Sequence, residues 1–115
     1  MSEITKKNAS AFKKLKTCTF LKDVRSGSLK AVWDLGHLKQ FGKGEVILRA
    51  KEEINHIYFL LSGKVIQYNL THLGKRKILF ILGPGALLND HVFDSHYSSI
   101  YCESIENCLV FVIPK

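Results

Sequence analysis

The side chains of this sequence that could ligate a metal or exchange a thiol are few and widely spaced. Its three cysteines, Cys18, Cys102 and Cys108, form no Cys-x-x-Cys pair. Zinc sites and disulfide frameworks need paired cysteines, and an iron–sulfur cluster needs four thiolates. We therefore expect buried, reduced thiols. A redox pair between Cys102 and Cys108, which flank the short stretch Glu103–Asn107, remains an open alternative.

The histidines give no catalytic or metal-binding pattern. The nearest two along the chain are His91 and His96, so the His-x-His cluster of a metal-dependent cupin enzyme is missing. No nucleophile stands at a recognisable spacing from a base, and no haem-ligand motif is present. We expect no enzyme activity, no catalytic residue, no bound metal and no cofactor. The other histidines are His37, His56 and His72.

Positive charge is the strongest bulk signal, with a net charge of +7 and a sequence pI near 9.4. The basic residues cluster near the N-terminus and again at Lys75–Lys77, but none occurs between Lys77 and Lys115. A basic balance is compatible with a polyanionic partner, so non-specific nucleic-acid binding is one alternative function. The aromatic residues do not alternate with these charges, as a single-strand binding surface would require.

A chain of 115 residues, 46% of them hydrophobic, is expected to form one globular domain. No apolar run approaches the roughly 18 residues that a membrane span needs. The first 16 residues lack the apolar core of a signal peptide. We expect a cytoplasmic protein without membrane contact.

Two short helices are predicted ahead of a series of strands. The first helix covers Asn8–Lys16, and the second carries Leu29, Val32 and Trp33 on one face and ends at Gly36. Short apolar stretches separated by glycine turns then predict seven strands of an antiparallel sandwich or barrel. The predicted organisation is a helical lead-in over residues 1–36 and a β-barrel domain over 37–115. The expected strands are Leu38–Phe41, Val46–Arg49, Ile57–Leu61, Val65–Leu70, Lys77–Leu82, Tyr97–Glu103 and Leu109–Ile113.

Four motifs in order carry a resemblance to a known family. Phe-Gly-Lys-Gly-Glu begins at Phe41, Tyr-Phe-Leu-Leu-Ser-Gly-Lys-Val begins at Tyr58, a charged hairpin covers Gly74–Lys77, and Leu-Gly-Pro-Gly covers Leu82–Gly85. In this order and spacing they resemble the cyclic-nucleotide-binding-like sensor domain of Crp/Fnr-type bacterial transcription regulators, over roughly residues 20–113. The resemblance implies a mainly β protein, a double-stranded β-helix (jelly-roll) barrel preceded by one or two short α-helices. It also implies an effector-sensing role, with DNA contacted only through a helix-turn-helix domain that this chain lacks.

The same resemblance locates the effector site in the segment after Gly85. In cyclic-nucleotide-binding members a short helix there offers amides to the phosphate, a glutamate holds the ribose, and an arginine neutralises the phosphate. Here a short helix is expected near Leu87–Asp90, with Asn89 at the glycine position and Asp90 at the glutamate position. Ser98 stands at the arginine position and is followed by Ser99. We therefore expect no binding of cyclic AMP in the usual way.

The remaining side chains of this segment suit a small uncharged or aromatic effector of unknown identity. Apolar groups would line the pocket together with Val92, Tyr97 and Ile100, and Asp90, Ser98 and Ser99 would supply the polar points. A barrel that has lost its ligand and serves as an interaction module is the other alternative, and a homodimer is compatible with both. The candidate ligand-binding residues are Leu87, Leu88, Asn89, Asp90, Ser98, Ser99 and Tyr101.

Overall fold

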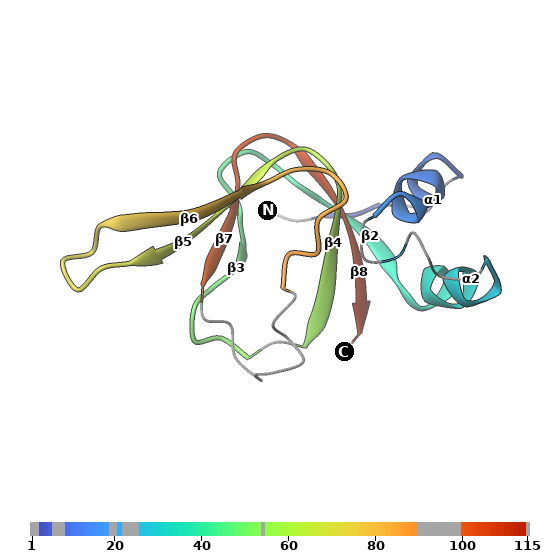
Figure 1. Cartoon of the computed structure of the whole chain (residues 1–115), viewed down its shortest axis with the longest axis horizontal. Coiled ribbons are helices and arrows are strands. Elements are labelled where there is room, and N and C mark those ends of the chain that lie inside the picture. Colours follow the sequence, from blue (N-terminus) through green and yellow to red (C-terminus); the bar gives the residue numbers. More distant parts are fainter. Residues whose placement is uncertain are drawn as a thin grey trace.

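Two four-stranded antiparallel sheets form the body of the protein (Figure 1). The computed structural model describes residues 3–5, 9–18, 21, 26–53, 55–89 and 100–114. Sheet A has the strand order β1–β2–β8–β4, and sheet B has the order β3–β7–β5–β6. The strands are β1 (Glu3–Thr5), β2 (His37–Phe41), β3 (Val46–Leu48), β4 (His56–Ser62), β5 (Val65–Leu70), β6 (Arg76–Leu82), β7 (Tyr101–Ser104) and β8 (Cys108–Pro114).

An apolar core fills the space between the two sheets. Because successive side chains of a strand point to opposite faces, Val110 and Val112 of β8 enter this inter-sheet core, while Phe111 points away from it. All three side chains are fully buried. Sheet A is therefore apolar on both faces and needs a cover on its outer side.

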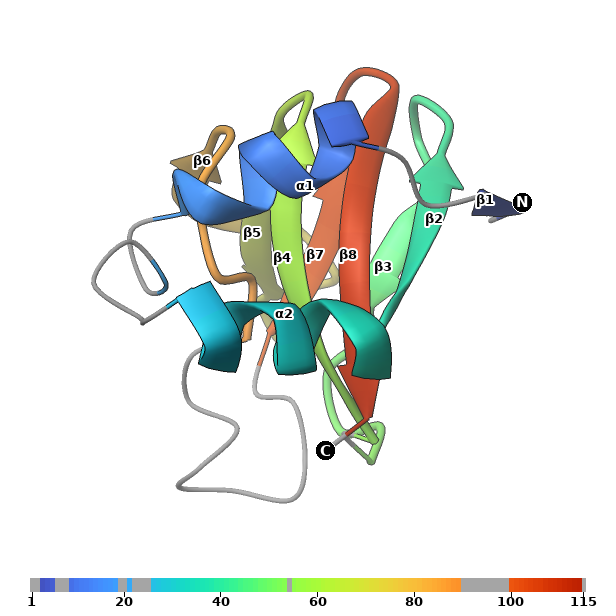
Figure 2. The same cartoon turned by 90° about the vertical axis from the view of Figure 1, so that its right-hand side faces the viewer.

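Two helices supply that cover (Figure 2). They are α1 (Ala9–Lys16) and α2 (Ser26–Leu35), and they bury Leu15 and Leu29 against Phe111 in a second, helix-side core. Trp33 of α2 stacks on Phe111 with ring centroids 5.2 Å apart. A methyl group at Gly36 would lie 2.7 Å from the Ile113 side chain, so glycine allows this close approach of α2 to β8.

The structure confirms both predicted helices and the jelly-roll class of the fold. Strand β1 was not predicted from the sequence, and it pairs with β2 at the edge of sheet A. The expected strand Tyr97–Glu103 is wrong at Ile100, because the strand begins at Tyr101, and its residues 97–99 lie outside the described residues. No described helix is long and apolar enough to cross a membrane. The boundary of the barrel domain at residue 37 remains a prediction.

Candidate functional site

The segment that follows strand β6, Gly83–Asn89, lies along the outer edge of β4. The amide of Gly85 donates to the carbonyl of Leu60 at 2.8 Å, and the amide of Leu60 donates to the carbonyl of Ala86 at 2.9 Å. Leu87 forms a β-bridge with Phe59. The predicted short helix near Leu87–Asp90 is therefore wrong at Leu87, where pairing with β4 keeps the backbone extended. Asp90 lies outside the described residues.

Asn89 fastens the end of this segment to β4. Its side chain is fully buried. The Oδ1 atom accepts from the amide of Tyr58 at 3.1 Å, and Nδ2 donates to the carbonyl of His56 at 2.8 Å. A side-chain amide has one acceptor and one donor group, so it can satisfy both backbone groups at once. Asn89 thus acts on the protein's own backbone at the position where the family pattern has glycine.

Leu88 connects the segment to sheet B. Its side chain is 1% exposed and packs in the inter-sheet core. Its amide donates to the carbonyl of Tyr58 at 2.9 Å, and its carbonyl accepts from Nε2 of Gln67 at 2.6 Å. Gln67 is itself buried, on strand β5. Leu87 packs instead against the helix-side core, so the two leucines point to different sides of the segment.

Tyr101 lies on the outer face of sheet B. The strand alternates so that Cys102 and Ser104 are buried, while Tyr101 and Glu103 are partly exposed. Cys102 packs in the same core as Leu88. Tyr101 therefore lies on one side of sheet B, and Leu88 lies on the other side, in the inter-sheet core. The structure does not bring them together in one pocket.

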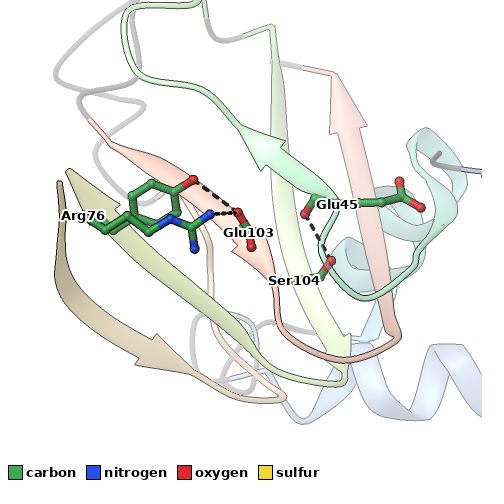
Figure 3. A network of polar contacts seen from close by, with 5 residues as sticks. Glu45, Arg76, Glu103 and Ser104 are labelled. Atoms are coloured by element: carbon green, nitrogen blue, oxygen red, sulfur yellow. Dashed lines mark hydrogen bonds and ion pairs between the residues drawn. The ribbon is translucent and has the colours of Figure 1, made fainter. Parts of the chain in front are cut away.

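A cluster of aromatic and charged side chains surrounds Tyr101 on that outer face. The rings of Tyr101 and Tyr68 stack 5.3 Å apart, and the guanidinium of Arg76 lies 4.5 Å from the centroid of the Tyr68 ring. Figure 3 shows the ion pair between Arg76 and Glu103, at 2.9 Å, to which the Tyr68 hydroxyl also donates. Burial raises the pKa of Tyr68, which keeps this hydroxyl protonated. These contacts hold the Arg76 side chain on the outer face of sheet B, away from the space between the sheets.

Two cavities among the described residues lie away from the described part of the predicted pocket. The larger, about 410 Å³, lies at the barrel end where the β2–β3, β4–β5 and β7–β8 turns meet. The smaller, about 60 Å³, includes Tyr58 and Glu52. The described candidate residues, Leu87, Leu88, Asn89 and Tyr101, line neither cavity. Ser98 and Ser99 lie outside the described residues. The larger cavity is lined by Gln40, Phe41, Gly42, Glu45, Ser62, Asn107, Cys108 and Leu109.

The two cysteines near the C-terminus both enter the inter-sheet core. Cys102 and Cys108 are buried and free. Burial raises the pKa of Cys102 to about 12, and it also raises that of Cys108. Because the thiolate is the reactive form, this environment suppresses thiol exchange in the folded protein. Among the described residues no group of three potential metal ligands is found.

Sequence comparison identifies the family of this domain. A family model for the cyclic nucleotide-binding domain matches residues 38–115. The chain belongs to the cyclic nucleotide-binding domain family. Within this family it is 24% identical, over 85 residues, to the HTH-type transcriptional regulator ArcR of two Staphylococcus epidermidis strains. That match covers 68% of this chain and 34% of ArcR, so the chain spans about a third of the length of these curated relatives.

Solved structures of the cyclic nucleotide-binding domain family share the fold. The sensor domain of the transcriptional regulator DNR from Pseudomonas aeruginosa superposes with a TM-score of 0.81 at 20% identity, covering 89% of this chain and 69% of that one. The regulatory domain of Toxoplasma gondii protein kinase A with cAMP gives 0.83 at 14% identity, covering 95% and 43%. The predicted likeness to the sensor domain of Crp/Fnr-type regulators is thereby confirmed.

A third structural relative is named as cAMP-independent. It is the regulatory subunit of a cAMP-independent protein kinase A from Trypanosoma brucei, in a triple mutant bound to cAMP. One of the three substitutions replaces a threonine with an arginine. The TM-score is 0.80 at 18% identity, with 92% of this chain and 42% of that chain covered.

Proposed function

We propose that this chain is the effector-sensing domain of a Crp/Fnr-type transcription regulator and that its effector is not a cyclic nucleotide held by an arginine. Membership of the cyclic nucleotide-binding domain family and the likeness to ArcR and DNR support the sensing role. These relatives are regulators, and the sequence pairs no nucleophile with a base, so we also propose that the chain is not an enzyme. DNA recognition would belong to a separate helix-turn-helix domain.

The observation that carries the proposal is the missing cation. No arginine or lysine occurs between Lys77 and Lys115, so the segment that holds phosphate in other members has no arginine or lysine side chain. An anion moved from water into a protein interior without a paired cation meets a large desolvation cost. Ser98, at the arginine position, can offer only a neutral hydrogen bond, which is weaker than a charge-assisted one.

The nearest arginine does not replace that charge. Arg76 stands on the outer face of sheet B, where Glu103 binds its Nη2 atom at 2.9 Å and Tyr68 lies beneath its guanidinium. To serve a ligand between the sheets, it would have to leave both partners and cross to the other face of the strand. The ion pair therefore keeps Arg76 from supplying the missing counter-charge.

Backbone amides of the segment Gly83–Asn89 also already donate hydrogen bonds within the protein. The amides of Gly85 and Leu88 donate to carbonyls of β4, and the amide of Ala86 donates to the carbonyl of Gly83. Free amides at a helix start are what an anionic phosphate normally finds in this family's sites. Those three amides are held by protein carbonyls instead, which further lowers the affinity expected for a cyclic phosphate.

The Trypanosoma relative agrees with a role for an arginine in cAMP binding. A member of the fold named as cAMP-independent is found with cAMP in a mutant with three substitutions, one of which introduces an arginine. By analogy, we propose that the loss of one cation separates this chain from the cAMP-binding members.

The proposed effector is a small uncharged or aromatic molecule. The proposed contacts come from residues around Leu87, Asp90, Ser98 and Ser99. A ligand-free interaction module is the second candidate, and it is favoured by Leu88, which fills the core, and Asn89, whose amide binds β4. In both cases the basic surface would give only non-specific contact with nucleic acid.

A thermal-shift screen distinguishes these candidates. A ligand that binds only the folded protein raises the melting temperature, and the rise grows with the ratio of ligand concentration to Kd. We expect a rise with at least one small aromatic or uncharged compound and none with cyclic AMP or cyclic GMP. No rise with any compound would favour the ligand-free module, and a rise with a cyclic nucleotide would overturn the proposal.

A further inference from the structure

Exposed apolar side chains gather on the hairpin formed by β5 and β6. Among the described residues six large apolar side chains are exposed, and five of them lie on this hairpin. Figure 1 shows the hairpin projecting away from the two-sheet body. Contiguous apolar patches of this kind are uncommon on monomers and usually mark an interaction surface. The five are Leu70, Leu73, Ile78, Phe80 and Ile81, each at least 46% exposed.

Strand β6 is an edge strand with little protection against further pairing. It is the last strand of sheet B, and among the described strands only β5 pairs with it. Every second residue of such an edge presents an unpaired amide and carbonyl to one side. Residues 76–82 contain no proline, and charge occurs only at Arg76 and Lys77. The edge can therefore accept another strand.

The exposed side chains lie on both faces of the hairpin. Ile78 pairs with Tyr68, and Ile81 pairs with Ile66, on the outer face that carries the aromatic cluster. Phe80 pairs with Gln67, whose side chain points to the inter-sheet side. A helix laid on one face would cover only one of these sets and leave the edge backbone unpaired. A strand added to the edge covers both sets and satisfies the backbone.

We propose that β6 pairs antiparallel with β6 of a second copy of this chain, about a twofold axis between Leu79 and Phe80. A β-bulge at this point, where the register with β5 shifts between Gln67 and Tyr68, brings Ile78 and Ile81 to the same face although they are three positions apart. The proposed register places Ile78 opposite the partner's Ile81, and both lie on the outer face. Paired apolar side chains of this kind stabilise antiparallel strands.

The charges of β6 agree with this register. Lys77 falls opposite the partner's Leu82, and Arg76 falls opposite the partner's Gly83. Like charges directly opposite each other would destabilise the pair, and the antiparallel arrangement separates them. Pairing along a seven-residue edge buries a small area compared with a stable dimer interface. The association is therefore expected to be weak and concentration-dependent.

Sedimentation equilibrium of the full chain, from low to high micromolar concentration, tests the proposal. We expect the wild type to dimerise with rising concentration. Ile78→Lys should weaken dimerisation about tenfold or more, because the substitution acts at both symmetric contacts. Leu35→Lys is the matched control, since Leu35 is 68% exposed on helix α2, and it should dimerise like the wild type. A wild type that stays monomeric, or equal dimerisation of the two variants, would overturn the proposal.

Cross-linking tests the register without relying on a destabilising change. In the proposed pairing, Ile78→Cys faces the partner's residue 81 and not the partner's residue 78. A mixture of Ile78→Cys and Ile81→Cys should therefore form a disulfide-linked dimer under oxidation, and each variant alone should form much less. Dimerisation without preferential linkage in the mixture would contradict the register. Neither experiment involves an effector, so its outcome is independent of the proposed sensing function.

Discussion

Asn89 shows how one side chain can make an expected ligand-contacting position part of the protein's own structure. The resemblance predicts a ligand-contacting position, but the structure places the Asn89 amide between two backbone groups of β4. No local sequence pattern predicts this contact, because Asn89 lies 31 and 33 residues from the groups it binds. Gln67 did carry a signal, since it is a polar residue within the apolar strand Val65–Leu70.

Replacing Asn89 should test its role in stability. Asn89→Ala leaves the amide of Tyr58 and the carbonyl of His56 without their buried partner, which should cost about 2–4 kcal/mol of unfolding free energy. Asn55→Ala removes the same side chain at an exposed position and should change little. The measurement is chemical denaturation of both variants. Equal stability of the two would show that the Asn89 contacts do not hold the segment to β4.

The buried thiols predict a loss of stability at alkaline pH. Burial raises the pKa of Cys18 to about 11 and that of Cys102 to about 12, from an ordinary value of 9.0. The folded state therefore favours the protonated thiols. Their contribution is fully present below the ordinary value of 9.0 and is lost as pH rises from there toward the folded-state pKa values.

The double variant Cys18→Ala/Cys102→Ala isolates that effect. Its unfolding free energy should fall less steeply above about pH 9 than that of the wild type, because the two raised thiol pKa values no longer contribute. The measurement is the pH dependence of denaturation from neutral to alkaline pH. Parallel curves for the variant and the wild type would contradict the explanation.

At the scale of the elements, the turn between β4 and β5 has the strictest requirement for glycine. Gly63 has a φ of +91°, and a methyl group there would lie 2.7 Å from Sγ of Cys108 and close to the Asn107 carbonyl. Gly44 has a similar φ of +88° but open space around it. A comparison of Gly63 with Gly44 therefore separates the cost of a left-handed backbone from the cost of steric overlap.

Alanine substitution at both glycines should show the difference. Gly44→Ala should cost about 1–2 kcal/mol for the left-handed backbone alone. Gly63→Ala should cost a further 1–3 kcal/mol or more, because the β4–β5 turn must move away from the β7–β8 turn. Thermal or chemical denaturation measures both. Equal losses at the two positions would mean that the close approach at Gly63 is not constrained.

The elements also show where prediction from sequence succeeded. An apolar face at helical spacing located the second helix, and short apolar stretches between glycine turns located every strand of the barrel after residue 36, because those signals are local. Strand β1 was missed because three residues carry no periodicity of their own and pair with β2 only through the fold. Pairing between Gly83–Asn89 and β4 was missed for the same reason.

At the scale of the whole molecule, the location of the effector site remains a prediction. The resemblance places Leu87, Leu88 and Asn89 in the expected effector segment, but it could not show which way each side chain points. Tyr101 was grouped with Leu88 as part of one pocket, but the alternation along β7 puts it on the face of sheet B that points away from the core holding Leu88. The absence of arginine and lysine between Lys77 and Lys115 can be read from the sequence alone, and the structure adds that Arg76 is held by Glu103.

The central claim is that a domain of the cyclic nucleotide-binding fold does not bind cyclic AMP because it lacks the phosphate-neutralising cation. Isothermal titration with millimolar cyclic AMP tests it most directly on three proteins: the wild type, Ser98→Arg, and Ser95→Arg as a matched control for added charge. We predict no measurable binding by the wild type or by Ser95→Arg, and binding gained by Ser98→Arg. Micromolar affinity of the wild type for cyclic AMP would contradict the claim.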